Sequence, residues 1–313
     1  MSNLKVVFMG TPSFAVPILE GLINNYNVVM VVCQPDRKKN RKGEVIKPDT
    51  KVLAELHNIP VFQPLKVKED YQTIIDMNPD IIITCAYGQI IPETLLNYPK
   101  YGCINVHGSL LPKYRGGAPI HWAIINGEKT TGITIMTMDK KMDAGDIITQ
   151  RSIDIDDDMI LDELYSKMSH LGKDLLLDTL PSIINGTAKY TKQDESLVTF
   201  GFNVTKEDEK IDFNNSGINI KNKVRGLNSI PGAYCYLDNL RMKIYEVELE
   251  ENKKYKNNNI GEIINVTNDS IVVLCNDSLV YIKDIAIEGK KRCKVKDYFN
   301  GIKKEILIGK VLK

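Results

Sequence analysis

The sequence holds few of the features that mark disulfide-rich or metal-dependent proteins. Its six cysteines (33, 85, 103, 235, 275 and 293) form no C-x-x-C pair, so neither a disulfide framework nor a paired-cysteine metal site is indicated. The four histidines (57, 107, 121 and 170) lack H-E-x-x-H or other ligand spacing, and we expect no metal. With a formal net charge of +1, overall charge does not indicate a nucleic-acid partner.

Long apolar runs are also missing. The longest, residues 81–86, is interrupted by Thr84 and is far too short to cross a bilayer. The N-terminus passes directly from Met-Ser-Asn-Leu-Lys into an apolar segment without a signal-peptide pattern. We therefore expect a cytoplasmic protein with reduced thiols and no membrane association.

The first half of the chain nevertheless alternates buried strands with helices. Apolar runs without polar alternation predict strands over 6–9, 28–33, 81–85 and 103–106, with helices from residue 13 and over 52–56. This pattern predicts a Rossmann-like, doubly wound, mostly parallel sheet. The turn at residues 10–15, Gly-Thr-Pro-Ser-Phe-Ala, lacks the later glycines of a dinucleotide site and the Gly-Lys-Ser/Thr of a phosphate loop, so NAD and ATP are not indicated.

The pattern changes after a long predicted helix over 159–184, which ends at Asn185-Gly186. Residues 186–206 are polar, and beyond them short β-branched runs over 242–247, 261–266, 271–275 and 279–285 are separated by Asn, Asp and Gly turns. We predict a catalytic domain over 1–188, a linker over 189–206, and a C-terminal OB-like β-barrel domain over 207–313.

The chemically informative segment is residues 102–112, Gly-Cys-Ile-Asn-Val-His-Gly-Ser-Leu-Leu-Pro. Asn105 and His107 share one face of a strand at its carboxyl end, where open α/β sheets place ligand sites. Asp143 lies in another turn rich in small residues, 142–146, which follows a strand, so an amide, an imidazole and a carboxylate at two strand ends could converge on one pocket. That set suits direct transfer of a one-carbon acyl group to an amine, with oxyanion donors and a proton acceptor but no protein nucleophile. The alternative is a structural role, in which Asn105 and His107 only satisfy the hydrogen bonds of a buried loop.

These motifs resemble the folate-dependent formyltransferase family. The resemblance rests on Asn105-x-His107-x-Ser109-Leu110-Leu111-Pro112 together with Asp143, and it implies that Asn105, His107 and Asp143 are the catalytic residues. It also implies that the loop of Ser109, Leu110, Leu111 and Pro112 binds the folate donor, 10-formyltetrahydrofolate. The turn containing Tyr87 and Gly88 is similar to part of the family's folate pocket.

Further segments, over 8–15, 34–37 and 132–136, resemble members that formylate methionyl initiator tRNA. Residues 37–51 hold seven Lys or Arg, which alone would indicate a solvated loop. With the resemblance they imply tRNA contacts, of which Arg41 matches the family's arginine most closely and Arg37 and Lys42 are further candidates. The segment Asn40-Arg41-Lys42-Gly43-Glu44 is less glycine-rich than is usual there. The basic barrel residues Lys290, Lys291, Arg292, Lys294 and Lys296 could add backbone contacts.

Other functions remain open on the sequence alone. A formyltransferase for an amino sugar nucleotide or a ribonucleotide amine would have the same catalytic residues but no need for a basic insertion. A non-catalytic RNA-binding protein would keep the insertion but would not need Asn105, His107 and Asp143. We expect a monomer whose partners are reduced folate and initiator methionyl-tRNA.

Overall fold

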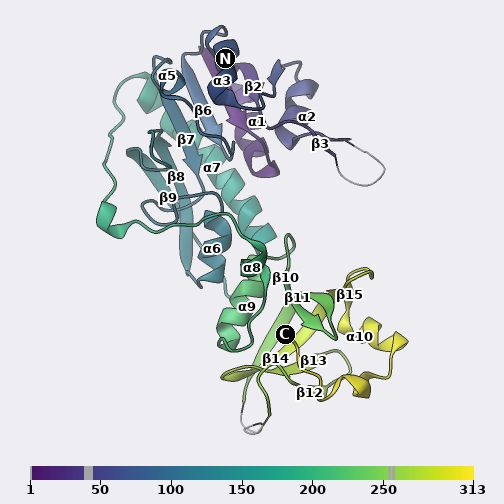
Figure 1. Cartoon of the computed structure of the whole chain (residues 1–313). Helices are drawn as coiled ribbons and strands as arrows, with labels where there is room; N and C mark the ends of the chain where they lie inside the picture. The colour runs from purple at the N-terminus through teal and green to yellow at the C-terminus, as the bar shows by residue number, and fades with distance from the viewer. Residues whose placement is uncertain (1, 39–44, 253–254, 256–257) are drawn as a thin grey trace. The chain divides into compact units, whose positions relative to one another are not determined.

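A computed structural model describes residues 2–38, 45–252, 255 and 258–313. The chain packs as two compact units (Figure 1). The first comprises Met1–Pro119, Thr130–Asp154 and Tyr165–Phe202, and the second comprises Ile120–Lys129, Ile155–Leu164 and Asn203–Lys313. The chain therefore enters the second unit before the predicted linker is reached. The predicted domain boundaries at residues 188 and 206 stay a prediction.

The first unit is built on a sheet with strand order β5-β2-β1-β6-β7-β8-β9 in the described part of the chain. The pairs from β5 to β7 are parallel, whereas β7–β8 and β8–β9 are antiparallel. This arrangement confirms the predicted Rossmann-like, mostly parallel sheet. The strands are β1 (Ser2–Gly10), β2 (Tyr26–Val32), β5 (Val61–Phe62), β6 (Ile81–Cys85), β7 (Cys103–His107), β8 (Thr130–Thr137) and β9 (Ile147–Asp154).

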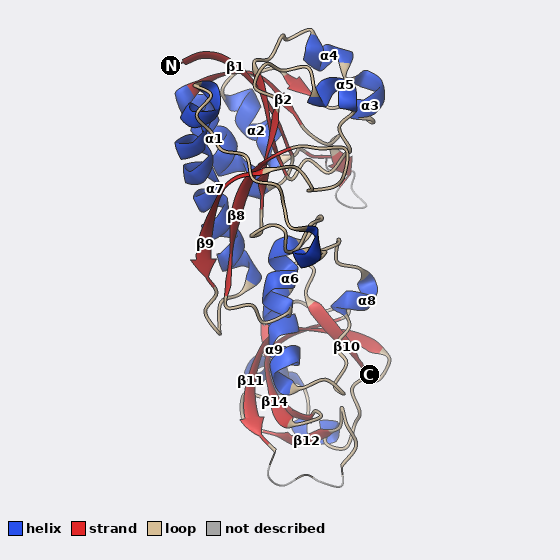
Figure 2. Cartoon of the chain, turned by 90° about the vertical axis from the view of Figure 1, so that its left-hand side faces the viewer, coloured by secondary structure: helices blue, strands red, loops and turns tan. Residues whose placement is uncertain are grey.

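Helices cover both faces of this sheet (Figure 2). On one face lie α1 (Val16–Asn25) and the part of α7 (Leu161–Ile184) that belongs to this unit. A Cβ built on Gly172 of α7 would lie 3.1 Å from Val106 Cγ1 and 3.4 Å from Ile18 Cδ1, so the helix lies directly against β7 and α1. The other face packs against α3 (Val67–Asp70), α4 (Gln72–Ile75) and α5 (Glu93–Leu96), where Val7, Met9 and Ile82 join one apolar cluster. A further short helix, α2 (Asp49–Leu56), lies near β2.

The second unit is an antiparallel β-barrel. Its strands are β10 (Ala233–Leu237), β11 (Leu240–Glu251), β12 (Ile263–Val266), β13 (Ile271–Leu274), β14 (Ser278–Ile287) and β15 (Cys293–Lys294), in the path β10-β11-β14-β13-β12 with β15 on β14. The C-terminal residues close this path: Leu312 N–H donates to Gly261 O at 2.8 Å beside β12, and Tyr236 N–H of β10 donates to Lys313 O at 2.7 Å. Closure removes free strand edges and gives the barrel its enclosed apolar core.

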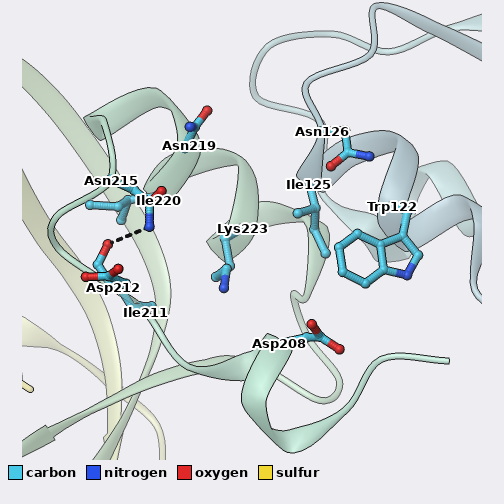
Figure 3. A pocket seen from close by; sticks show the side chains of 10 residues that line it. All are labelled: Trp122, Ile125, Asn126, Asp208, Ile211, Asp212, Asn215, Asn219, Ile220 and Lys223. Carbon is cyan, nitrogen blue, oxygen red and sulfur yellow. Dashed lines mark hydrogen bonds between the residues drawn. The ribbon is translucent and has the colours of Figure 1, made fainter. Parts of the chain in front are cut away.

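Short helices surround the barrel. They are α6 (Pro119–Ile125), α8 (Lys206–Glu209), α9 (Gly217–Gly226) and α10 (Val295–Tyr298). Between α6, α8 and α9 lies a cavity of about 380 Å³ (Figure 3), lined by Trp122, Ile125, Asn126, Asp208, Ile211, Asp212, Asn215, Asn219, Ile220 and Lys223. Its carboxylates are used locally, because Asp208 accepts from Thr205 N–H in a helix cap and Asp212 accepts from Asn214 N–H in a turn. These two carboxylates therefore serve a helix cap and a turn of this unit.

Two connecting segments of the first unit have structure of their own. A two-stranded hairpin, β3 (Arg37–Lys38) and β4 (Val45–Ile46), carries the start of the basic run. The polar segment after α7 packs along the first unit. It contains a 3₁₀ helix, Glu195–Leu197, and its Thr191 N–H donates to Ile147 O of β9 at 2.9 Å. Among the described residues, no helix is both long and apolar enough to cross a membrane.

Candidate active site

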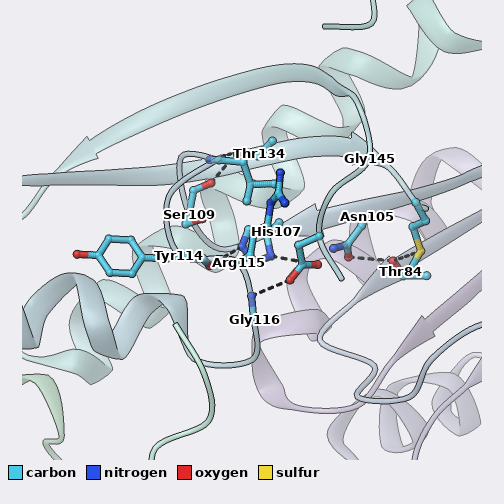
Figure 4. Close-up of polar contacts among 12 residues, drawn as sticks. Thr84, Asn105, His107, Ser109, Tyr114, Arg115, Gly116, Thr134 and Gly145 are labelled. Carbon is cyan, nitrogen blue, oxygen red and sulfur yellow. Dashed lines mark hydrogen bonds and ion pairs between the residues drawn. The ribbon is translucent and has the colours of Figure 1, made fainter. Parts of the chain in front are cut away.

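Asn105 and His107 project from the same face of β7, as strand alternation requires. The side chain of Asn105 is oriented by Thr84 on the neighbouring strand β6, whose Oγ1 donates to Asn105 Oδ1 at 2.8 Å. Because the amide oxygen is occupied, the Nδ2 group is the part of Asn105 that remains to donate to a bound molecule. Figure 4 shows this pair beside His107.

His107 is nearly buried, with 5% of its surface exposed, and its ring is oriented by the loop that follows β7. Its Nε2 lies 3.1 Å from Tyr114 O. A carbonyl can only accept, so Nε2 carries a proton and Nδ1 of the neutral ring has a free lone pair. Nδ1 lies 3.8 Å from Asp143 Oδ1, which is longer than a hydrogen bond.

Asp143 reaches His107 from an unexpected direction. Its turn follows β8, and β8 is antiparallel to β7, with Ile104 opposite Thr137 and His107 opposite Thr134. The loop over 138–146 therefore starts at the amino end of β7 and returns toward His107. Asp143 adopts a left-handed φ of +49°, and its Oδ2 accepts from Gly116 N–H at 2.8 Å. The carboxylate is thus fixed by the loop that carries Tyr114.

Gln193 and Arg115 hold the Asp143 loop in place. Gln193 Nε2 donates to the carbonyls of Asp143 (2.8 Å) and Gly145 (2.9 Å), and its Oε1 accepts from Arg115 Nη2 at 2.9 Å. Arg115 is 4% exposed and also donates to Glu195 Oε1 at 2.8 Å. A buried guanidinium needs such partners, because an unpaired charge in the interior is costly. This clamp joins the loops on both sides of the carboxylate.

The geometry suits a substrate that brings protons to the site. The closest atoms of the two side chains, His107 Nδ1 and Asp143 Oδ1, lie too far apart for a direct hydrogen bond, and an imidazole nitrogen without a proton and a carboxylate can each accept a proton. An amine between them could lose a proton to either group. Once protonated, Nδ1 becomes a donor and can join Asn105 Nδ2 in stabilising an oxyanion. The described residues contain no group of three or more His, Cys, Asp or Glu arranged to hold a metal ion.

The loop from Ser109 to Pro112, which we predicted to bind the folate, is held by hydrogen bonds to neighbouring protein groups. Ser109 is fully buried, and its hydroxyl donates to Lys113 O at 2.6 Å. Thr134 Oγ1 donates to Ser109 O at 2.6 Å and accepts from Leu111 N–H at 3.1 Å, which ties the loop to β8. Leu111 is 3% exposed, whereas Leu110 and Pro112 are half-buried. A donor-binding role for this loop stays a prediction, and the Ser109 hydroxyl and Leu111 side chain are already committed to the fold.

The other predicted donor residues follow β6. Tyr87 is 5% exposed, its ring belongs to the apolar cluster beside α3 to α5, and burial raises the pKa of its phenol. The Tyr87 carbonyl accepts from Gln34 Nε2 at 2.9 Å, while Gly88 is exposed with a φ of +84°. The turn therefore offers backbone, not the Tyr87 ring, to solvent at this edge of the sheet. Ile90, 83% exposed, is an apolar side chain in the same turn that sequence reasoning missed.

The structure describes part of the predicted RNA-binding segment. Arg37 is exposed on β3, and Arg41 and Lys42 lie outside the described residues. At the base of the hairpin, Lys51 Nζ lies 2.8 Å from Asp36 Oδ2 and donates to Gln63 Oε1 at 2.7 Å. The Lys51 hydrogen bond holds the pKa of Asp36 below its ordinary value. Lys51 thus stabilises the hairpin.

Comparison with known proteins places both units in one family. The chain matches the formyl transferase model over residues 4–180 and the model of the formyl transferase C-terminal domain over residues 203–303. The chain belongs to the formyl transferase family. The first match contains Asn105, His107 and Asp143, and the second contains most of the barrel.

Relatives of this formyl transferase extend along its whole length. It is 45% identical to a methionyl-tRNA formyltransferase of Malacoplasma penetrans, covering 99% of this chain and 97% of the relative. It is 47% identical to a methionyl-tRNA formyltransferase of Staphylococcus aureus, covering 98% and 99%. Among solved structures, the fold is similar to that of WlaRD, a sugar 3N-formyl transferase crystallised in the presence of dTDP and 5-N-formyl-THF, with a TM-score of 0.64, 21% identity and coverage of 93% and 100%.

Sequence reasoning missed the residues that position the site of this formyl transferase. Thr84 orients the Asn105 amide, and Gln193 and Arg115 hold the Asp143 loop. The signal for Thr84 was a polar residue interrupting an otherwise apolar buried strand, which needs a bonding partner in the interior. Gln193 lies in a polar stretch that resembles a linker, and nothing local distinguishes it.

Proposed function

We propose that the protein transfers the formyl group of 10-formyltetrahydrofolate to the amino group of methionyl initiator tRNA, for translation initiation. The observation that carries this proposal is the identity of 45% and 47% to methionyl-tRNA formyltransferases, which spans both units. The formyl-folate named with WlaRD supports a reduced folate as the donor class. The protein acts as a monomer in the cytoplasm, where its acceptor is made and used, and sedimentation of the purified protein tests the first point.

In the proposed reaction, the neutral methionyl amine attacks the formyl carbon directly. A carbon–nitrogen bond forms to the acceptor, the carbonyl oxygen becomes negative, and Asn105 Nδ2 stabilises it as a hydrogen-bond donor. The amine loses a proton to His107 Nδ1 or Asp143. The bond between the formyl carbon and the folate N10 then breaks, and N10 takes up a proton as the tetrahydrofolate leaves. The chain needs no nucleophile, metal or redox group for these steps.

The donor lies against the loop of Ser109 to Pro112 and the turn of Tyr87 and Gly88 in this proposal. The exposed backbone of the turn and the exposed Ile90 support it, because a flat heteroaromatic ring needs both polar edge contacts and an apolar surface. Arg37, Arg41 and Lys42 contact phosphates of the acceptor arm. Exposure of Arg37 on β3 is compatible with that contact.

The decisive experiment offers the purified protein 10-formyltetrahydrofolate with methionyl-tRNA in one reaction and a dTDP-linked amino sugar in another. We expect formylation of the RNA acceptor alone. Transfer only to the sugar would establish the rival formyltransferase, which shares the fold of WlaRD. Binding of RNA without turnover of either acceptor would favour a non-catalytic RNA-binding protein.

The catalytic assignment is tested by Asn105→Ala, His107→Ala and Asp143→Ala. Each should lower kcat by about a hundredfold or more, since each removes a transition-state donor or a proton acceptor. Matched controls are the exposed residues Asn97, His57 and Asp139, whose substitution by alanine should leave kcat within about twofold. Near-normal turnover in the first three variants would mean that the catalytic residues are misassigned.

A further inference from the structure

Two phenylalanine rings lie stacked on the surface of the first unit. Phe200 and Phe202 are 52% and 57% exposed, their ring centroids are 5.1 Å apart, and their planes differ by 8°. Residues two apart in an extended segment share a face, which brings the rings together. A single exposed apolar side chain needs no explanation, but two parallel aromatic rings side by side form a patch with an ordered π surface. We call Phe200 and Phe202 the ring pair.

The ring pair is fixed to the loop that builds the active site. Arg115 N–H donates to Thr199 O at 2.9 Å, Gly201 N–H donates to Arg115 O at 2.8 Å, and Ala118 N–H donates to Gly201 O at 2.8 Å. Gly116, between these bonds, is the residue whose N–H binds the Asp143 carboxylate. The loop over residues 115–118 therefore contacts both the segment that carries the ring pair and the carboxylate of Asp143, a proposed catalytic group.

This close approach depends on glycine. Gly116 has a φ of +125°, and a Cβ built on it would lie 2.8 Å from Gly201 O. Any other residue would have to push the ring-bearing segment away from the loop. The sequence thus keeps the segment of the ring pair tight against the loop of Tyr114 and Gly116, although the rings themselves face solvent.

We propose that the ring pair is a stacking platform for nucleobases in the single-stranded end of the RNA acceptor. This inference rests on the proposed function. The reacting amine belongs to a methionine whose carboxyl group is esterified to the last nucleotide of the acceptor, so the bases next to it must lie close to His107 and Asp143 when transfer occurs. Aromatic rings that present a face to solvent bind unpaired bases of any sequence by stacking.

The charges around the ring pair are compatible with a polyanionic strand. The acidic side chain of Glu195, on the same segment, lies 2.8 Å from the buried Arg115 guanidinium. That ion pair offsets the negative charge of Glu195, and so limits its repulsion of phosphates. The other occupants to distinguish are the aromatic ring of the folate donor and a second copy of the chain.

Steady-state formylation of methionyl-tRNA is the first test. The double variant Phe200→Ala/Phe202→Ala should raise KM for the RNA about tenfold, with kcat and the KM for the folate within twofold of the parent, because stacking of a remote base is lost equally from ground and transition states. Phe200→Leu/Phe202→Leu should behave like the alanine variant, and Phe200→Tyr/Phe202→Tyr like the parent. The matched control is Tyr190→Ala, which removes a 50% exposed aromatic ring from the same polar segment.

A spectroscopic test reports stacking directly. A transfer RNA with 2-aminopurine in place of an adenine in its 3′ single strand should lose fluorescence on binding the parent, the tyrosine variant and the Tyr190→Ala variant. It should keep its fluorescence with the alanine and leucine variants at saturating protein. These variants change surface rings, so equal melting temperatures will confirm that the comparison is between folded proteins.

Three outcomes overturn the platform. They are an unchanged KM for RNA with unchanged quenching in the alanine variant, a rise in the KM for folate instead, or a change in sedimentation that marks the rings as an interface between copies. The parent separates these from failure of the proposed function. If the parent formylates methionyl-tRNA and the variants do so equally well, the platform alone is wrong. If the parent formylates only an amino sugar, both proposals fall.

Discussion

Replacing Gln193 by glutamate should disable the enzyme while leaving most of the fold intact. Gln193 is 9% exposed and uses both ends of its amide: Oε1 accepts from Arg115, and Nε2 donates to the carbonyls of Asp143 and Gly145 at 2.8 and 2.9 Å. Gln193→Glu has the same shape and strengthens the contact with Arg115, because the acceptor becomes charged. It has no proton to donate, so it breaks only the contacts with the Asp143 loop.

The magnitude can be worked from those contacts. Two neutral hydrogen bonds contribute about 1 kcal/mol each, so the loss is about 2 kcal/mol, partly offset by the stronger Arg115 pair. Carboxylate oxygens at 2.8 and 2.9 Å from two carbonyl oxygens would also repel them, so the loop must move. A displacement of about 1 Å at a catalytic group lowers turnover by about a hundredfold. We expect the free energy of unfolding to fall by about 1–2 kcal/mol and kcat to fall by roughly 30- to 100-fold.

Single-turnover formyl transfer at saturating donor and methionyl-tRNA measures the catalytic effect, and urea denaturation measures stability. Asn97→Asp, which adds a charge at an exposed position without changing shape, is the control and should match the parent in both. A Gln193→Glu variant that is folded and transfers formyl groups at the parent rate would refute the reasoning that this clamp positions Asp143.

Two further predictions concern stability. Gly145→Ala should lower the free energy of unfolding by more than about 3 kcal/mol, since a Cβ there would lie 1.8 Å from Thr137 O. The control is Gly301→Ala, where a Cβ meets nothing within 4 Å. Equal denaturation midpoints for the two variants would contradict the steric argument. Burial lowers the pKa of His121 below its ordinary value of 6.5. As the pH falls, the unfolded chain therefore takes up this proton at a higher pH than the folded chain does, and the free energy of unfolding should decrease below about pH 6.5. His121→Gln should flatten that part of the stability–pH curve relative to the parent and to His57→Gln at an exposed position, and an unchanged slope would contradict a lowered pKa at the half-buried His121.

The sequence predicted the strands whose side chains are apolar on both faces, such as β1, β6 and β7, because burial leaves a continuous apolar run. It could not give the direction of β8, since a central strand has the same apolar run whether its neighbour is parallel or antiparallel. It also missed β9, an edge strand with much of its surface exposed and Gln150, Arg151 and Ser152 in its middle. An edge strand pairs on one side only and needs no apolar pattern.

Helix α9 illustrates a second limit. It begins at Gly217, ends at Gly226 and is rich in Asn and Lys, so its intrinsic helix propensity is poor. Ile220 and Val224 are almost fully buried in the barrel core, and the Ser216 side chain accepts from Asn219 N–H at the N-terminus. Tertiary packing and a cap therefore make this helix. Both contributions depend on residues that are far away or act singly, and a propensity argument does not detect them.

In the basic run, the structure shows which charges are paired with acidic groups, whereas a sequence only gives their number. Seven Lys or Arg fall between residues 37 and 51. In the described part of this run, Lys51 is 14% exposed and lies 2.8 Å from Asp36, and Lys47 lies 2.6 Å from Glu55. A phosphate could compete for the exposed Lys47 pair, which contributes little to stability, but not for Lys51 without opening the base of the hairpin. Under the proposed function, the RNA contacts of this segment therefore rest on its other basic residues, of which Arg37 is exposed.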